Sequence, residues 1–163
     1  LITLVCHCIF RKSLYSGVVP MDWKRANVCV IYKKGIRNEC GNYRPVSLTS
    51  QACKLFEGLI KDAISEHLHK FNLIRQSQHG FMSHKSCLTN LLEFLEFVSK
   101  HVDNGVPVDV IYLDFKKAFD RVPHGRLLSK IKALGINGLV AQWISNWLVD
   151  RQQRVVIKGK FSQ

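Results

Sequence analysis

The chain has 163 residues, about the length of one ordinary domain and enough to bury a hydrophobic core. Apolar residues make up 47% of the sequence and charged residues 22%, so the composition excludes a globally disordered protein. The formal net charge is +12 and the pI is about 9.7, and a surplus of this size indicates an anionic partner or a role in solubility.

The positive charge is concentrated towards the two ends of the sequence. Residues 1–50 contain eight Lys and Arg against two acids, and residues 108–163 contain ten against four, whereas residues 51–107 contain six of each. If the two outer segments meet in space, they form one basic surface.

The first ten residues, LITLVCHCIF, are apolar and are followed by Arg11 and Lys12. This pattern resembles a signal peptide or a membrane anchor, but the charges follow the apolar run and the run is too short to span a bilayer. We therefore expect a core helix. Because the chain does not begin with Met, we expect it to lie inside a longer protein. The six cysteines form no C-x-x-C pair, which favours free thiols in the nucleus or cytoplasm over a secreted protein.

Two short strands are predicted at residues 26–32 (ANVCVIY) and 44–49 (RPVSLT). The connector KKGIRNECGNY is basic and contains two glycines and two asparagines, residue types that favour turns. The sequence therefore predicts a β-hairpin with a basic loop.

Apolar residues at helical spacing predict a long amphipathic helix over residues 52–71. The polar link LIRQSQHGFMSHKS leads to a second helix, from near Ser86 to Asn104. Later predicted elements are a strand at 109–114, helices at about 125–134 and 139–149, and a strand at 154–158. No repeat or linker divides the chain, so we expect one α+β domain.

The segment VDVIYLDFKKAFDRVPH, residues 108–124, places Asp114 at the end of an apolar predicted strand. Ligands of α/β sheets gather at such an edge. Asp114 could simply cap the segment that begins near Lys116. A nucleophilic role like that in haloacid-dehalogenase phosphotransferases is disfavoured, because those enzymes need a second acid where Lys116 stands. A Mg²⁺ ligand of a nucleotidyl transferase, followed by an aromatic residue such as Phe119, fits the pattern.

The stretch YLDFKKAFDRVPH resembles the first catalytic motif of the reverse transcriptases of LINE-type non-LTR retrotransposons, in particular the jockey and chicken-repeat groups. Four further segments are similar to other parts of that family, and they occur in family order: GVVPMDWKRANVCVIYKKG, GNYRPVSLTSQACKLFE, SQHGFMSHKSCLTNLL and LGINGLVAQWISNWLVDRQQRVVIKGKFS. The resemblance covers nearly the whole chain.

The resemblance implies roles for residues around the first motif. Asp114 would be the first Mg²⁺ ligand, and the backbone carbonyl of Phe115 would assist the same metal site. Phe119 would occupy the steric-gate position, where a ring leaves no room for a 2′-hydroxyl and so favours dNTPs. The alternative for Phe119 is an ordinary aromatic residue of the core.

The resemblance also assigns Lys33, Lys34 and Arg44 to the fingers hairpin that holds the triphosphate of the incoming nucleotide. The chemistry agrees, because phosphate recognition suits both the point charge of Lys and the planar fork of Arg. The alternative is a solvated basic loop.

Five residues resemble the template-contacting segment of the family: Gln78, Gly80, Phe81, Lys85 and Ser86. For each of them, a place in an ordinary surface loop is an equal alternative. The chain departs from the family where Met82, Ser83 and His84 replace a basic residue and a glycine, which weakens the expected template contact.

Taken together, the sequence predicts an α+β fragment of a right-hand polymerase, with fingers and flanking helices over about 1–107 and the start of the palm over about 108–163. In the family, a Pro-Gln-Gly segment and a paired-Asp hairpin with the remaining metal ligands follow the position of Ser162, so we expect the fragment alone to be inactive. The expected function of the complete protein is RNA-directed DNA polymerisation, with an RNA template, a DNA primer, dNTPs and Mg²⁺, and no membrane contact. The alternative is a non-catalytic nucleic-acid-binding remnant of such an element.

Overall fold

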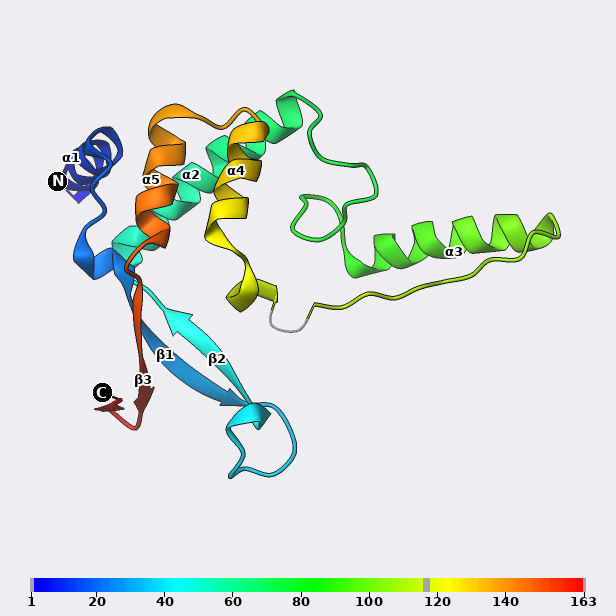
Figure 1. Cartoon of the computed structure of the whole chain (residues 1–163), viewed down its shortest axis with the longest axis horizontal. Helices are drawn as coiled ribbons and strands as arrows, with labels where there is room; N and C mark the ends of the chain where they lie inside the picture. The colour runs from blue at the N-terminus through cyan, green and yellow to red at the C-terminus, as the bar shows by residue number, and fades with distance from the viewer. Residues whose placement is uncertain (1, 116–117, 163) are drawn as a thin grey trace. The chain divides into compact units, whose positions relative to one another are not determined.

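A computed structural model describes residues 2–115 and 118–162, and for Phe119 the backbone only (Figure 1). The chain divides into two compact units. Unit 1 contains residues 1–66 and 123–163, and unit 2 contains residues 67–122. The combination of helices with a sheet confirms the predicted α+β class.

Unit 1 contains a mixed four-stranded sheet in the order β2-β1-β3-β4. β1 (Arg25–Tyr32) pairs antiparallel with β2 (Tyr43–Leu48) and parallel with β3 (Gln152–Ile157), and β3 pairs antiparallel with β4 (Lys160–Phe161). The predicted hairpin and the predicted strand at 154–158 are confirmed within two residues at most ends. The short strand β4 was not predicted.

The two faces of β1 differ in exposure. Ala26 and Val28 are buried, whereas Arg25 and Asn27, which alternate with them along the strand, are exposed. Since successive side chains of a strand point to opposite faces, one face of the sheet is covered here and the other carries polar groups.

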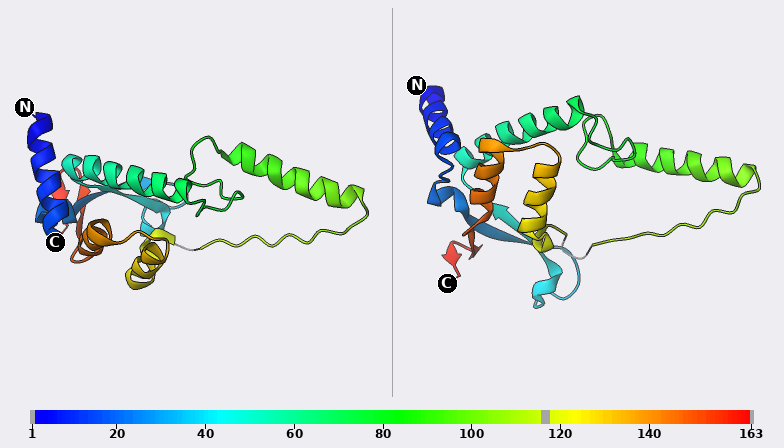
Figure 2. Two further views of the ribbon diagram at one scale, coloured as in Figure 1. Left: turned by 90° about the horizontal axis from the view of Figure 1, so that it is seen from above. Right: turned by 45° about the horizontal axis from the view of Figure 1, so that its top comes forward.

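The helices of unit 1 follow the predicted periodicity. They are α1 (Ile2–Ser16), α2 (Gln51–Lys70), α4 (His124–Ala133) and α5 (Gly138–Leu148), with the short 3₁₀ helices η1 (Met21–Lys24) and η2 (Cys40–Asn42). α2 continues into unit 2 with its last residues. α4 and α5 lie side by side, as the two views in Figure 2 show.

The core of unit 1 is built on aromatic side chains from α2 and α5. The rings of Phe56 and Trp143 meet edge to face at a centroid distance of 5.0 Å, and Trp147 stacks on Trp143 at 6.1 Å. The indole N–H of Trp143 donates a hydrogen bond of 2.9 Å to Ser13 Oγ on α1. Such aromatic pairs add stability beyond the area they bury, so these contacts join the three helices.

The first half of α1 is not a core helix, contrary to the expectation from its apolar sequence. Phe10 and Leu14 pack against the core, but Ile2 is 80% exposed and Leu4 is 65% exposed. The apolar run predicts the helix correctly. Whether the apolar side chains of the helix are buried depends on another element packing against them, and the run does not specify that element. Within the described residues, no helix combines the length and the apolar character that crossing a bilayer requires.

The six cysteines are free, as expected from their spacing, and one of them is fully buried. Two causes together raise the pKa of the Cys53 thiol from 9.0 to about 12: first its burial, and second the Glu57 carboxylate, whose Oε1 lies 2.9 Å from Sγ and accepts a hydrogen bond from the protonated thiol.

This pKa predicts a loss of stability at alkaline pH. Below pH 9 the thiol is protonated in both states, and between pH 9 and 12 it ionises in the unfolded chain alone. The free energy of unfolding should therefore fall by about 1 kcal/mol from pH 9 to pH 10 through this group. Urea titrations of the wild type and of Cys53→Ala measure this, because the alanine variant lacks the effect while other titrating groups act on both. Equal pH dependence in the two proteins would contradict the assignment.

Unit 2 contains the helix α3 (Cys87–Asp103) and the 3₁₀ helix η3 (Ala118–Arg121). No residue of α3 is buried, although apolar side chains repeat along it. Phe94 of α3 lies at a ring distance of 6.4 Å from Tyr112, so the segment after α3 runs back along this helix (Figures 1 and 2).

The predicted strand at 109–114 is wrong. Residues 106–115 have no regular secondary structure, and Ile111, Tyr112 and Leu113 are each more than 80% exposed. The segment has the composition of a strand, but a strand forms only where a neighbouring strand completes its hydrogen bonds. Within the described residues, the sheet contains only the strands β1, β2, β3 and β4. None of these strands pairs with this segment.

Candidate nucleotide and nucleic-acid contacts

The hairpin between β1 and β2 is closed by a network centred on Asn42. The backbone N–H of Lys33 donates to Asn42 O at 2.8 Å, and the Asn42 side chain donates to Ile36 O at 2.9 Å and to Glu39 Oε2 at 3.0 Å. Gly35 has a φ of +95°, and a Cβ there would lie 2.7 Å from Asn42 Nδ2. The loop therefore requires glycine at this position and holds one conformation.

Lys33, Lys34 and Arg44, which the resemblance assigns to the triphosphate, all lie on this hairpin. All three are exposed. Arg44 is the register partner of Ile31, and the lysines follow β1 directly. The three cations thus extend from a fixed backbone into solvent, where an anion can reach them.

Sequence reasoning missed a fourth cation of the hairpin, Arg37. Its guanidinium lies 5.3 Å from the centroid of the Tyr32 ring, which in turn meets Tyr43 at 5.7 Å. Tyr32 and Tyr43 are register partners next to the Ile31–Arg44 pair, so they lie on the opposite face of the hairpin. The basic composition of the loop indicated Arg37, but the stacking depends on the register of the two strands.

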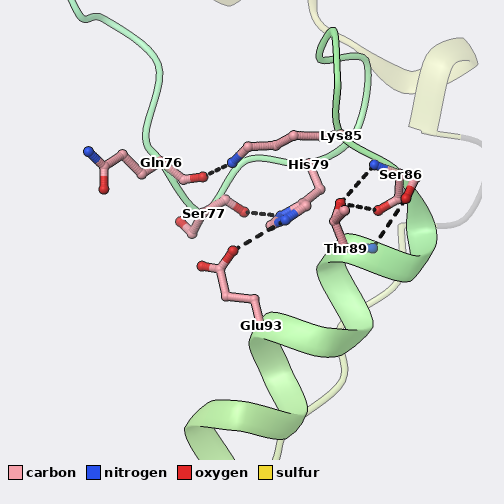
Figure 3. Close-up of polar contacts among 7 residues, drawn as sticks. All are labelled: Gln76, Ser77, His79, Lys85, Ser86, Thr89 and Glu93. Carbon is pink, nitrogen blue, oxygen red and sulfur yellow. Dashed lines mark hydrogen bonds and ion pairs between the residues drawn. The ribbon is translucent and has the colours of Figure 1, made fainter.

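The predicted template segment in unit 2 is anchored to α3 by a histidine (Figure 3). His79 is buried, with Nε2 3.2 Å from Glu93 Oε2 and Nδ1 3.2 Å from the carbonyl oxygen of Ser77. Both ring nitrogens face an acceptor, so the ring makes both contacts as a donor only in its protonated form. No periodic pattern in the sequence relates His79 to Glu93, which is why the pair was not predicted.

The same segment is closed by a second set of bonds (Figure 3). The ammonium group of Lys85 donates to Gln76 O. Ser86 caps α3, because its hydroxyl accepts from Thr89 N at 3.2 Å while Thr89 Oγ1 accepts from Ser86 N at 2.8 Å. Lys85 and Ser86, two of the predicted template contacts, are therefore engaged within the loop and its helix.

The remaining predicted template residues lie between these anchors. Gln78 donates a hydrogen bond of 2.9 Å to Gly80 O, and Phe81 is 95% exposed. Phe81 has a φ of +62°, a conformation that costs a bulky residue energy unless the surrounding loop enforces it. The loop thus presents the Phe81 ring to solvent.

Asp114 and Phe115 are both exposed, and Asp114 has no hydrogen-bond or ion-pair partner among the described residues. Phe119 belongs to η3, and its side chain lies outside what the structure describes. Across residues 2–115 and 118–162, no three His, Cys, Asp or Glu side chains are grouped so that they could hold a metal ion. A carboxylate oxygen suits Mg²⁺, but these residues alone do not fit a complete Mg²⁺ site.

Comparison with known families gives a match over most of the chain. Residues 31–163 match the family model described as reverse transcriptase (RNA-dependent DNA polymerase). The matched segment includes the hairpin cations, the template segment and Asp114.

Individual relatives are proteins of mobile elements from Drosophila melanogaster. The chain is 27% identical over 99% of its length to a probable RNA-directed DNA polymerase from transposon BS, and 32% identical over 80% to one from transposon X-element. It is 32% identical over 77% of its length to the RNA-directed DNA polymerase from mobile element jockey. The chain spans between 14% and 17% of the length of these relatives.

Proposed function

Because the chain belongs to the reverse transcriptase (RNA-dependent DNA polymerase) family, we propose that it forms the fingers and the first part of the palm of a polymerase that copies RNA into DNA. The complete protein would extend a primer with dNTPs on an RNA template. The proposed activity is the one named for the relatives of the chain. The chain spans only a small part of the length of these relatives.

The observation that carries the proposal is the set of three exposed cations, Lys33, Lys34 and Arg44, on one rigid hairpin. A triphosphate carries several negative charges in a small volume, and a fixed group of ammonium and guanidinium donors matches it. The second region is the anchored loop in unit 2, where the exposed Phe81 ring offers a surface on which a template base could stack.

Asp114 is proposed as one Mg²⁺ ligand of the complete protein, with the carbonyl of Phe115 beside it and Phe119 as the ring that selects dNTPs. Mg²⁺, when bound, would supply a positive charge close to the phosphate groups. The other carboxylates that such a site needs would come from the paired-Asp hairpin of the longer protein.

The second candidate function is nucleic-acid binding without catalysis. It is favoured because, among the described residues, Asp114 belongs to no group of three or more His, Cys, Asp or Glu side chains that could hold a metal ion, while phosphate binding needs only the cations. Primer extension by the longer protein separates the two candidates, because a remnant that only binds would extend no primer.

Replacing Arg44 tests the proposed role of the hairpin. In the 163-residue chain, Arg44→Ala should weaken dATP binding about tenfold, because a charge-assisted hydrogen bond to phosphate is removed, and should change primer–template affinity by less than about twofold. Fluorescence anisotropy with labelled dATP and labelled primer–template, each across a salt series, measures both. Lys61→Ala on α2 is the control, since Lys61 is a cation with a side-chain exposure of 76% away from the hairpin.

One result would decide against this role of Arg44, and another would decide against the interpretation of the net charge. Equal losses for dATP and primer–template would make Arg44 an ordinary backbone contact. Primer–template binding by the wild type that does not weaken as salt rises would remove the nucleic-acid interpretation of the net charge.

A further inference from the structure

A groove of about 820 Å³ lies on unit 1 at the edge of the sheet where β1 and β3 begin and β2 ends. Its volume is typical of a site for a small molecule or for a short stretch of a polymer. Polar residues dominate the lining, among them Arg25, Asn27, Thr49, Ser50, Gln152 and Arg154. None of these belongs to the hairpin loop or to the template segment.

The register of the parallel pair places two arginines close together on the exposed face. Arg25 is the partner of Gln152, and Asn27 is the partner of Arg154. Side chains two positions apart share a face, so the two arginines are diagonal neighbours across β1 and β3. The alternate residues Ala26 and Val28 are buried, which confirms that the arginines lie on the open side.

The guanidinium of Arg154 is held in place by two contacts. Its Nε–H donates a hydrogen bond of 2.9 Å to Asn27 Oδ1, and its Cζ lies 3.8 Å from the centroid of the Phe161 ring. These contacts leave the terminal N–H groups for a ligand, in a fixed plane. A donor that is already ordered loses little entropy on binding.

The charge of the groove is not neutralised from within. Among the described residues, neither Arg25 nor Arg154 forms an ion pair, and Asp22 contributes the one carboxylate of the described lining. Thr49 and Ser50 bring hydroxyl groups that can donate to an anion. The groove therefore combines two guanidinium groups with neutral donors, the usual composition of a site for phosphate.

We propose that this groove binds phosphate groups, as a second anion site at the opposite end of β1 from the hairpin. β1 has eight residues, so the two sites are separated by about 23 Å along the strand. The phosphates could belong to the backbone of a nucleic-acid strand or to a free nucleotide. Both sources present the same chemistry to Arg25 and Arg154.

The test compares arginine variants of the full chain with a matched control. Arg25→Gln and Arg154→Gln each remove one guanidinium of the groove, and Arg11→Gln removes one on α1, where it stacks on Tyr15. Circular dichroism and thermal melting establish that each variant is folded. Binding is measured by anisotropy with a short fluorescein-labelled single-stranded RNA and, separately, with labelled dATP.

If the groove binds a strand, both groove variants should bind the RNA about tenfold more weakly than Arg11→Gln, and dATP should be unaffected. The slope of the logarithm of affinity against the logarithm of salt should also fall by about 0.7 for each phosphate that the variant no longer neutralises. A loss confined to dATP would identify a nucleotide as the source. Asp22→Asn should tighten binding of whichever probe the groove binds, because it removes a negative charge that repels phosphate.

The proposal is overturned if both groove variants behave like Arg11→Gln with both probes, or if the wild type binds neither probe. The outcome is separable from that of the hairpin. If replacement of Arg44 weakens binding but replacement of Arg25 or Arg154 does not, the proposed function stands and the groove is excluded as a binding site. A variant that unfolds is replaced by Asn27→Ala, which keeps the net charge, frees Arg154 and should weaken binding in the same direction.

Discussion

Asp114→Asn should reduce primer extension by at least about 10³-fold, a loss of about 4 kcal/mol of transition-state stabilisation, in a longer protein that combines this chain with the paired-Asp hairpin. The substitution replaces a carboxylate by an amide of nearly the same size, and so removes a negative charge from the proposed Mg²⁺ ligand. Because Asp114 is exposed and lies outside every helix and strand, the fold should be unaffected. Single-turnover extension rates at saturating dNTP and Mg²⁺ measure the loss.

The chain offers a matched control in Asp109, a second exposed acid of the same irregular segment. Asp109→Asn makes the same change of charge and should leave extension at the wild-type rate. If Asp114→Asn extends primers as fast as Asp109→Asn, then Asp114 is not a metal ligand and its resemblance to the first motif is without catalytic meaning here.

Trp143→Ala should lower the free energy of unfolding of unit 1 by about 4 kcal/mol. Trp143 is only 2% exposed and fills the space between α2, α5 and α1, where it contacts Phe56, Trp147 and Ser13. Its removal leaves a cavity and deprives the Ser13 hydroxyl of its donor. Urea unfolding followed by far-UV circular dichroism measures the change.

Ser13→Ala separates packing from hydrogen bonding at this position. It removes the acceptor of the Trp143 N–H, and also the bond of 2.7 Å from Ser13 Oγ to Val18 O, without creating a large cavity. The expected cost is about 1 to 3 kcal/mol, because the buried indole N–H then lacks a partner. A cost of Trp143→Ala below that of Ser13→Ala would show that the tryptophan does not organise the core.

Local sequence signals predicted most of the elements, because each depends on residues close together in the chain. The turn residues of KKGIRNECGNY predict the hairpin, and the structure shows that Asn42 and Gly35 fix its loop. The start of α3 is likewise predicted near Ser86, where the structure has a capping box with Thr89. Helix starts and turns are governed by backbone hydrogen bonds within a few residues, which a sequence displays directly.

Pairings between distant residues could not be predicted in this way. The apolar run ending at Asp114 has the composition of a strand, and its failure to form one depends on the absence of a paired neighbour in the described residues. The parallel alignment of β3 with β1 is equally invisible in either strand alone.

The candidate sites also differ in whether their residues are close together or far apart in the sequence. The hairpin cations Lys33, Lys34 and Arg44 were assigned from the family resemblance, and the local turn that carries them was predicted from its own residues. The groove was not, because Arg25 and Arg154 meet only through the parallel pair, and the His79–Glu93 contact was missed because a loop residue reaches across to a helix. For Asp114, Phe115 and Phe119, catalytic roles remain predictions from the resemblance.

The parallel pair between β1 and β3 sets an order of assembly for a chain that emerges from a ribosome. Asn27 and Arg154, which share a hydrogen bond, are 127 positions apart, and all of unit 2 lies between them. The hairpin of β1 and β2 is local and can form as soon as residue 48 has left the exit tunnel. Synthesis then needs about 5 to 20 s to reach β3, at typical rates of roughly 5 to 20 residues per second. Throughout that interval the open edge of β1 is exposed to pairing with other chains, so a delay in translation between residues 48 and 152 should increase aggregation.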